Sequence, residues 1–141
     1  MKKAYSFIVR ALIIMGTSLS LTSCMNGIKI EVTGNDQPTF TINKAGWLGG
    51  YLECVGEIRI YEGLSDQSPP IWDLGSISTT TCKPIKQLKY GIVPDGYKEM
   101  IAPSTILEGR SYLLLASARG GYFGILKFKK EHDRFIVIDH N

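Results

Sequence analysis

The chain has 141 residues, of which 16 are Lys or Arg and 13 are Asp or Glu, so its formal net charge is +3. Three of the bases, Lys2, Lys3 and Arg10, precede residue 24, and no acid does, so residues 24–141 carry 13 bases and 13 acids. This balance argues against a nucleic-acid partner, which requires a basic face. The length after residue 23 is 118 residues, the size of one domain.

The N-terminus predicts a secretory signal. The bases Lys2, Lys3 and Arg10 are followed by an apolar run from Ala11 to Leu21. This run of 11 residues is shorter than the ~20 that a permanent transmembrane helix needs. We therefore expect residues 1–23 to be a cleaved signal peptide.

The residues that close this signal are Leu21-Thr22-Ser23-Cys24, and they resemble the lipobox of bacterial lipoproteins. The resemblance implies that Cys24 becomes the first mature residue and carries acyl chains such as palmitate. Several acyl chains give a stable membrane anchor. Residues 24–27 would then be a short lipidated tether. The alternative is a soluble secreted protein, in which Cys24 would be an odd third thiol.

The residue after the cysteine is Met25, where lipoproteins kept in the inner membrane often have aspartate. The resemblance therefore implies a location in the outer membrane, with the domain facing the periplasm. The short tether holds that domain close to the lipid surface.

The other cysteines, Cys54 and Cys82, are expected to form a disulfide, because the periplasm is oxidising. Such a bridge closes a loop of about 28 residues and would stabilise the fold by roughly 3.5 kcal/mol in the loop-entropy account.

Alternating apolar and polar residues predict strands along most of residues 28–141. The expected strands are 28–33, 39–42, 51–61, a short edge strand at 71–74 after Pro69-Pro70, 85–93, a strand beginning near Tyr112, 122–129 and 135–138. Gly56 is expected to interrupt the third as a bulge or turn, with Ile58 and Ile60 inward and Arg59 and Tyr61 outward. Residues 97–105 are the one stretch where a helical turn is plausible.

Turn signals occur about every ten residues, for example Arg119-Gly120-Gly121 and Glu131-His132-Asp133. The fold class is therefore all-β, a single antiparallel immunoglobulin-like β-sandwich of about seven or eight strands over residues 28–141. The segment Leu107-x-Gly109-x-x-Tyr112 resembles the start of a late strand in fibronectin type III domains. That resemblance implies a tyrosine corner, in which the Tyr112 hydroxyl bonds back to the preceding loop.

Little in the sequence supports catalysis. The two histidines, His132 and His140, lie in a hairpin turn and beside the C-terminus, where a base is poorly oriented. The cysteines and histidines lack the close spacing of a zinc site. The acid pairs Glu53–Glu57 and Asp95–Glu99 are ordinary surface acids. We expect no enzyme, no metal and no cofactor.

Binding is the remaining class of function. Aromatic and arginine side chains in glycine-rich loops are the usual anchors of protein interfaces. The candidate residues are Trp47, Tyr51, Tyr97, Arg119 and Tyr122. The alternative is that Trp47 folds over an edge of the core, and that the three tyrosines rim it.

As a whole, residues 28–138 resemble small bacterial lipoproteins described as immunity proteins of type VI secretion toxins. The likeness lies in Glu57-Ile-Arg-Ile-Tyr61 after the first cysteine of the domain, Leu88-Lys-Tyr-Gly91 after the second, and Gly109-x-x-Tyr112. It implies a non-catalytic periplasmic binder that neutralises a periplasm-acting toxin. The alternative is a structural or assembly accessory of the outer membrane.

Overall fold

A computed structural model describes residues 27–45, 54–78, 80 and 82–138. These residues form nine strands: β1 Ile28–Thr33, β2 Thr39–Lys44, β3 Val55–Glu62, β4 Trp72–Ser76, β5 Gln87–Lys89, β6 Tyr97–Ile101, β7 Ser111–Ala118, β8 Tyr122–Glu131 and β9 Arg134–Val137. Within them there is no helix, and so none that is long and apolar enough to cross a membrane.

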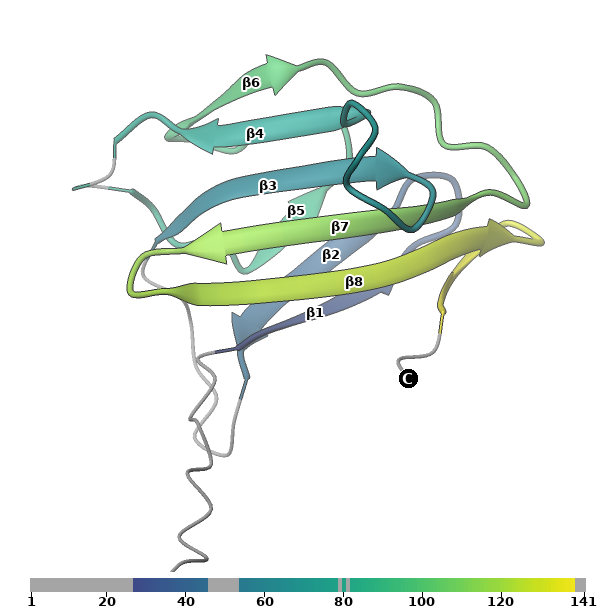
Figure 1. The fold of residues 1–141 in the computed structure, drawn as a ribbon, viewed down its shortest axis with the longest axis horizontal. Coiled ribbons are helices and arrows are strands. Elements are labelled where there is room, and N and C mark those ends of the chain that lie inside the picture. The colour runs from purple at the N-terminus through teal and green to yellow at the C-terminus, as the bar shows by residue number, and fades with distance from the viewer. Residues whose placement is uncertain (1–26, 46–53, 79, 81, 139–141) are drawn as a thin grey trace, which may run out of the picture.

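The strands form two antiparallel sheets that face one another (Figure 1). The smaller sheet has the order β1-β2-β5, and the larger has the order β6-β4-β3-β7-β8-β9. The neighbouring positions of β3, β7 and β8 correspond to the C, F and G strands of the immunoglobulin fold. The predicted all-β sandwich is confirmed, with nine strands in place of the expected seven or eight.

Apolar side chains of the two inner faces make the core. Phe40, Ile58, Ile60, Trp72 and Phe128 are all completely buried. Two aromatic contacts join the sheets: the rings of Phe40 and Phe128 lie 5.4 Å apart, and those of Trp72 and Tyr90 lie 4.9 Å apart, both edge to face. The inward-facing residues predicted from the alternation in β1, β2 and β3 are therefore confirmed.

Strand β3 carries the expected bulge. Its register with β7 shifts between Val55 and Glu57, so Gly56 is the extra residue. Tyr61 does lie on the outer face, but it is buried to 5% exposure, as is its cross-strand partner Leu113. The expected outward direction of Tyr61 is therefore confirmed, but on that face its side chain is covered and not solvated.

Three predicted elements differ in the structure. Residues 71–74 were expected at an edge, yet β4 lies inside the sheet, because β6 pairs with its free side. The helical turn expected in 97–105 is this strand β6, since pairing with β4 satisfies its backbone. Only Gln87–Lys89 of the expected strand 85–93 is regular, and Ile92 is 57% exposed.

The disulfide between Cys54 and Cys82 is present, with 5.3 Å between the two Cα atoms. Cys54 precedes β3 of the larger sheet, and Cys82 lies on the connection to β5 of the smaller sheet. The bridge therefore ties the two sheets together at one end of the sandwich. Its position differs from the B–F bridge of antibody domains.

The tyrosine corner is also confirmed. The backbone N–H of Leu107 donates to the Tyr112 hydroxyl at 2.8 Å, while the Tyr112 ring is 1% exposed and stacks on Phe128. This contact fixes the chain that enters β7.

Candidate binding surface

Three of the residues singled out from the sequence, Cys24, Trp47 and Tyr51, lie outside the described residues. The remaining binding candidates, Tyr97, Arg119 and Tyr122, occupy different environments at the same end of the sandwich.

Tyr97 belongs to the core. Its side chain is 5% exposed, and its hydroxyl donates to the backbone oxygen of Val55 at 2.6 Å. Burial raises the pKa of this hydroxyl, since the ionised form would lose its hydration. This burial favours the alternative that Tyr97 packs at the core, because the first residue of β6 points inward and its hydroxyl joins β6 to β3.

Tyr122 and Arg119 lie at the hairpin between β7 and β8. Tyr122 is half-buried against the core, and the ammonium of Lys44 lies 5.4 Å from its ring centroid, a cation–π contact. Arg119 is exposed in the turn. Tyr122 therefore contributes mainly to packing, whereas the guanidinium of Arg119 is accessible.

The outer face of the larger sheet presents a set of side chains that the sequence reasoning did not single out as a site. We call Arg59, Leu115, Phe123 and Ile125 the outer-face patch. The strand register places Arg59 opposite Leu115, and Leu115 opposite Ile125. Phe123 and Ile125 are 49% and 48% exposed, and Leu115 is half-buried. Apolar side chains around an arginine are typical of interface centres.

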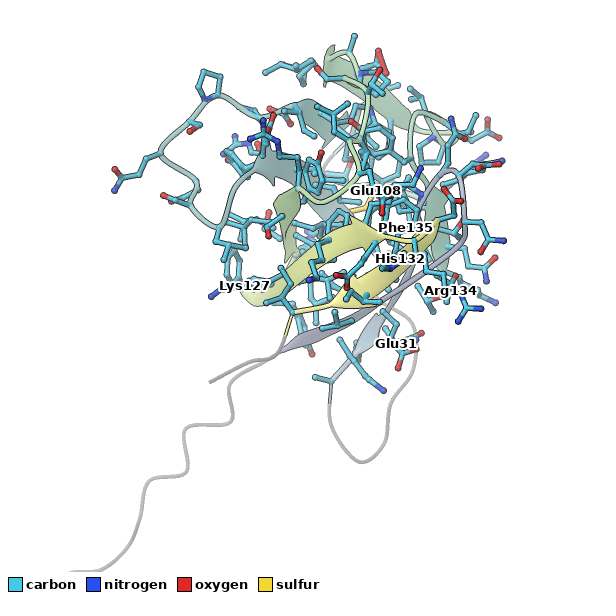
Figure 2. The ribbon with its side chains drawn as sticks, turned by 90° about the vertical axis from the view of Figure 1, so that its right-hand side faces the viewer. Glu31, Glu108, Lys127, His132, Arg134 and Phe135 are labelled. Carbon is cyan, nitrogen blue, oxygen red and sulfur yellow. A yellow bond between two sulfur atoms is a disulfide. The ribbon has the colours of Figure 1, made fainter. Side chains whose placement is uncertain are left out.

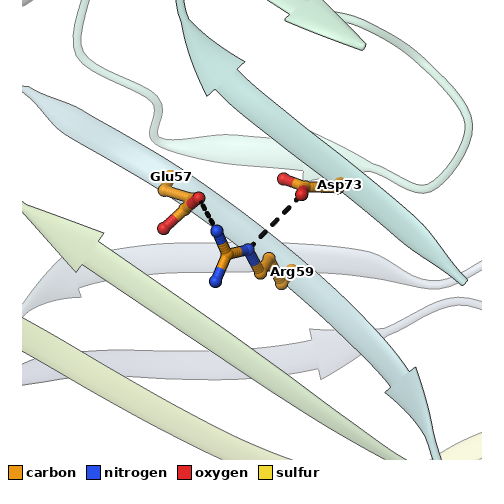
Figure 3. A network of polar contacts seen from close by, with 3 residues as sticks. All are labelled: Glu57, Arg59 and Asp73. Carbon is orange, nitrogen blue, oxygen red and sulfur yellow. Dashed lines mark hydrogen bonds and ion pairs between the residues drawn. The ribbon is translucent and has the colours of Figure 1, made fainter. Parts of the chain in front are cut away.

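Two carboxylates from neighbouring strands hold Arg59 in this patch (Figure 3). Its guanidinium pairs with Glu57 on the same strand and with Asp73 of β4 at 3.4 Å. Asp73 is only 9% exposed, and its Oδ1 atom makes no hydrogen bond within the described residues. Since the Arg59 side chain is still 42% exposed, it is both oriented by the sheet and accessible to a ligand.

The patch borders two hollows in the surface. A small one of about 70 Å³ is lined by Glu57, Arg59, Leu115, Ala116, Ser117 and Phe123. A larger one of about 340 Å³ is lined by Cys54, Gly56, Ser76, Ser117, Ala118 and Arg119. The first is far below the volume of a small-molecule site, so it suits the insertion of a single side chain. Because Ser117 lines both, the two form one uneven surface beside the Gly56 bulge.

A signal for the patch does exist in the sequence. Tyr122 to Leu126 is an unbroken run without a charge, although β8 has one inner face and one outer face. Such a run places apolar side chains on both faces, because successive residues alternate. The pairing of Arg59 with Asp73 has no such local signal, since 14 residues separate them.

The opposite end of the sandwich contains the β8–β9 turn (Figure 2). His132 and Asp133 there have φ of 51° and 57°, the backbone of a tight two-residue hairpin turn. The backbone N–H of His132 donates to the carboxylate of Glu108. In the part of the chain that the structure describes, no three His, Cys, Asp or Glu side chains gather in a group that could hold a metal ion.

Compared with protein-family models, with curated proteins and with solved structures, the chain matches none.

Proposed function

We propose that the mature protein is a membrane-anchored periplasmic lipoprotein of the outer membrane that works as a non-catalytic protein-binding module. Cys24 carries the acyl chains, and the outer-face patch meets the partner. The partner is a periplasm-acting toxin, which the lipoprotein neutralises as an immunity protein.

The observation that carries the proposal is the outer-face patch itself. Phe123 and Ile125 leave about half of each side chain in solvent on the outer face of the larger sheet. Contiguous exposed apolar surface on a soluble domain marks an interaction site. The oriented guanidinium of Arg59 supplies directional hydrogen bonds at the same place, since Arg donates in a rigid fork.

The resemblance to immunity lipoproteins supports the same class of function. In Glu57-Ile-Arg-Ile-Tyr61, the residues Ile58 and Ile60 are core, whereas Glu57 and Arg59 belong to the outer face. In Leu88-Lys-Tyr-Gly91, Leu88 and Tyr90 are buried. Most of the matching positions are therefore core positions in this chain. The residues that contact the toxin are not carried over from the immunity lipoproteins.

The first experiment is chemical cross-linking and affinity capture of the lipidated protein from envelopes, with mass spectrometry of the captured proteins. We expect a toxin to be enriched, and its retention to fall by roughly 30-fold in Phe123→Ser, as for an interface hot spot. Ile125→Thr should weaken capture in the same direction. The matched control is Ile92→Thr, because Ile92 is 57% exposed and lies outside the patch.

A second experiment measures fitness. Deletion of the protein should harm cells only when the captured toxin is produced, and the patch variants should reproduce that harm while folding normally. Harm without any toxin, together with capture of an envelope assembly, would replace the immunity role by that of a structural accessory. Unchanged capture by both patch variants would remove the patch from the interface.

A further inference from the structure

We propose that one end of the sandwich docks on anionic phospholipid headgroups, so that the domain stands on the membrane in a fixed orientation. This inference rests on the proposed acylation of Cys24. The docking surface is what we call the tether end: Gly27, Lys44, Ala45, Cys54, Ser76, Ile77, Lys83, Asp95 and the Arg119–Gly121 turn.

Backbone contacts bring the start of the domain to this end. The carbonyl oxygen of Gly27 accepts from the N–H of Ala45 at 2.8 Å, and Gly27 forms a parallel bridge with Phe123. Phe123 follows the β7–β8 turn by two residues. Gly27 therefore lies next to the start of β8, close to the β7–β8 turn that contains Arg119. This turn is at the left of Figure 1.

The length of the tether limits how far this end can lie from the lipid. Gly27 is the third residue after Cys24, and three residues of chain span about 10 Å at most. The Debye length at physiological ionic strength is about 8 Å, so charges at the tether end lie within reach of the headgroup charges. The opposite end, with the β8–β9 turn, lies farther from the lipid, because β8 runs away from the tether end (Figure 1).

The charges of the tether end suit an anionic surface. Its bases are Lys44, Lys83 and Arg119, and its one acid among the described residues is Asp95, which pairs with Lys83 at 3.2 Å. Lys44 and Arg119 therefore remain as net positive charge. Arginine binds phosphate through two parallel hydrogen bonds. Ile77, which is 66% exposed, supplies an apolar side chain for the interface.

The opposite end is of mixed sign. Its acids are Glu62, Glu108, Glu131 and Asp133, and its bases are Arg110, Lys129, Lys130 and Arg134; Arg110 pairs with Glu62 at 3.5 Å and Lys129 with Glu131 at 3.2 Å. Figure 2 labels Glu108 and Arg134 at this end. Acids and bases balance there, so this end offers anionic lipid no net positive charge. The charge distribution thus favours the same orientation as the tether, with the outer-face patch directed sideways and open to a periplasmic partner.

The test uses full-length lipidated protein reconstituted in vesicles of phosphatidylethanolamine with phosphatidylglycerol, and in vesicles of phosphatidylcholine alone. Hydrogen exchange is followed by mass spectrometry in peptides that cover Ile77 and the Arg119–Gly121 turn. We expect slower exchange on the anionic vesicles only, and high salt should abolish the difference. The β8–β9 turn should exchange equally in both.

The variant Lys44→Gln/Arg119→Gln should lower this protection by roughly 30-fold, the combined contribution of two basic residues near an anionic membrane surface. The matched control is Lys89→Gln/Arg134→Gln, since both residues are exposed near the opposite end. It should keep the protection.

Equal exchange at the tether end on both kinds of vesicle would overturn the inference, and so would an unchanged result in Lys44→Gln/Arg119→Gln. Mass analysis of the same samples separates the two proposals. A protein without acyl chains on Cys24 would remove the anchor itself, whereas an acylated protein without protection would remove only the docked orientation.

Discussion

Gly124 of β8 lies directly against Ile28 of β1 in the facing sheet. A Cβ atom built on Gly124 would stand 2.7 Å from the Cβ of Ile28 and 2.8 Å from its carbonyl oxygen. Since one of these atoms is backbone, β1 would have to move. The approach of the first strand to β8 therefore depends on the absence of a side chain at position 124.

We expect Gly124→Ala to lower the free energy of unfolding by about 2 kcal/mol, the usual cost of overpacking. Urea unfolding followed by tryptophan fluorescence measures it. Gly75→Ala is the matched control, because its Cβ would meet nothing closer than Met100 Cγ at 3.8 Å. That variant should unfold at the same or a slightly higher urea concentration. Equal effects of the two changes would contradict the account.

Removal of the Tyr112 hydroxyl tests the tyrosine corner. Tyr112→Phe keeps the stacking on Phe128 but leaves the N–H of Leu107 without its acceptor. Leu107 is 48% exposed, so water replaces part of the bond, and a loss of about 1 kcal/mol is expected. Tyr122→Phe should change stability little, because the structure describes no hydrogen bond from the Tyr122 hydroxyl to another described residue. If Tyr112→Phe left the free energy of unfolding unchanged, the corner would not stabilise the domain.

The disulfide should account for a large share of the stability. Cys54→Ser/Cys82→Ser is expected to lower the free energy of unfolding by roughly 3.5 kcal/mol, since the closed loop of about 28 residues regains its entropy in the unfolded chain. Equilibrium urea unfolding of the wild type with and without reductant provides the comparison. Reductant should not affect the double variant, and a wild type insensitive to reduction would refute the prediction.

The contact between Arg59 and Asp73 can be measured by a double-mutant cycle. Arg59→Gln leaves the buried Asp73 carboxylate without its counter-charge, which should cost about 1 to 2 kcal/mol, less than a fully buried pair because Arg59 is 42% exposed. Asp73→Asn added to Arg59→Gln should recover part of that loss. If the losses of unfolding free energy in the two single variants summed to the loss in the double variant, Arg59 and Asp73 would not be coupled.

Alkaline pH should destabilise the fold through three tyrosines. Burial raises the pKa values of Tyr90, Tyr97 and Tyr112 above the value near 10 of an unfolded chain. Above about pH 10 the unfolded state therefore binds fewer protons than the native state, so stability falls as pH rises. The slope is at most about 1.4 kcal/mol per pH unit for each tyrosine. Unfolding free energies measured at successive pH values should show it.

Tyr97→Phe serves as the control for this pH dependence. It removes one of the three titrating groups, so its stability should fall less steeply with alkaline pH than that of the wild type. Tyrosinate absorbance should also rise cooperatively with unfolding in the wild type. Full ionisation of Tyr90, Tyr97 and Tyr112 in the still-folded protein would contradict the prediction.

Much of the fold can be predicted from the sequence because its signals are local. Alternation in Ile28–Thr33 fixes which residues face the core, Gly56 marks the bulge in β3, and Leu107-x-Gly109-x-x-Tyr112 specifies the corner. The two cysteines left after Cys24 could pair only with one another. Each of these conclusions depends only on residues that are close together in the sequence, or on the number of cysteines.

Tertiary structure alone decided the rest, because strand pairing joins residues far apart in the chain. Tyr97 to Ile101 shows no clear alternation, and only its pairing with β4 makes it a strand and buries Tyr97. Arg59 meets Asp73 and Leu115 only through neighbouring strands. The lipobox resemblance predicts an anchor at Cys24, but only the contacts of Gly27 with Ala45 and Phe123 show which end of the sandwich that anchor would hold.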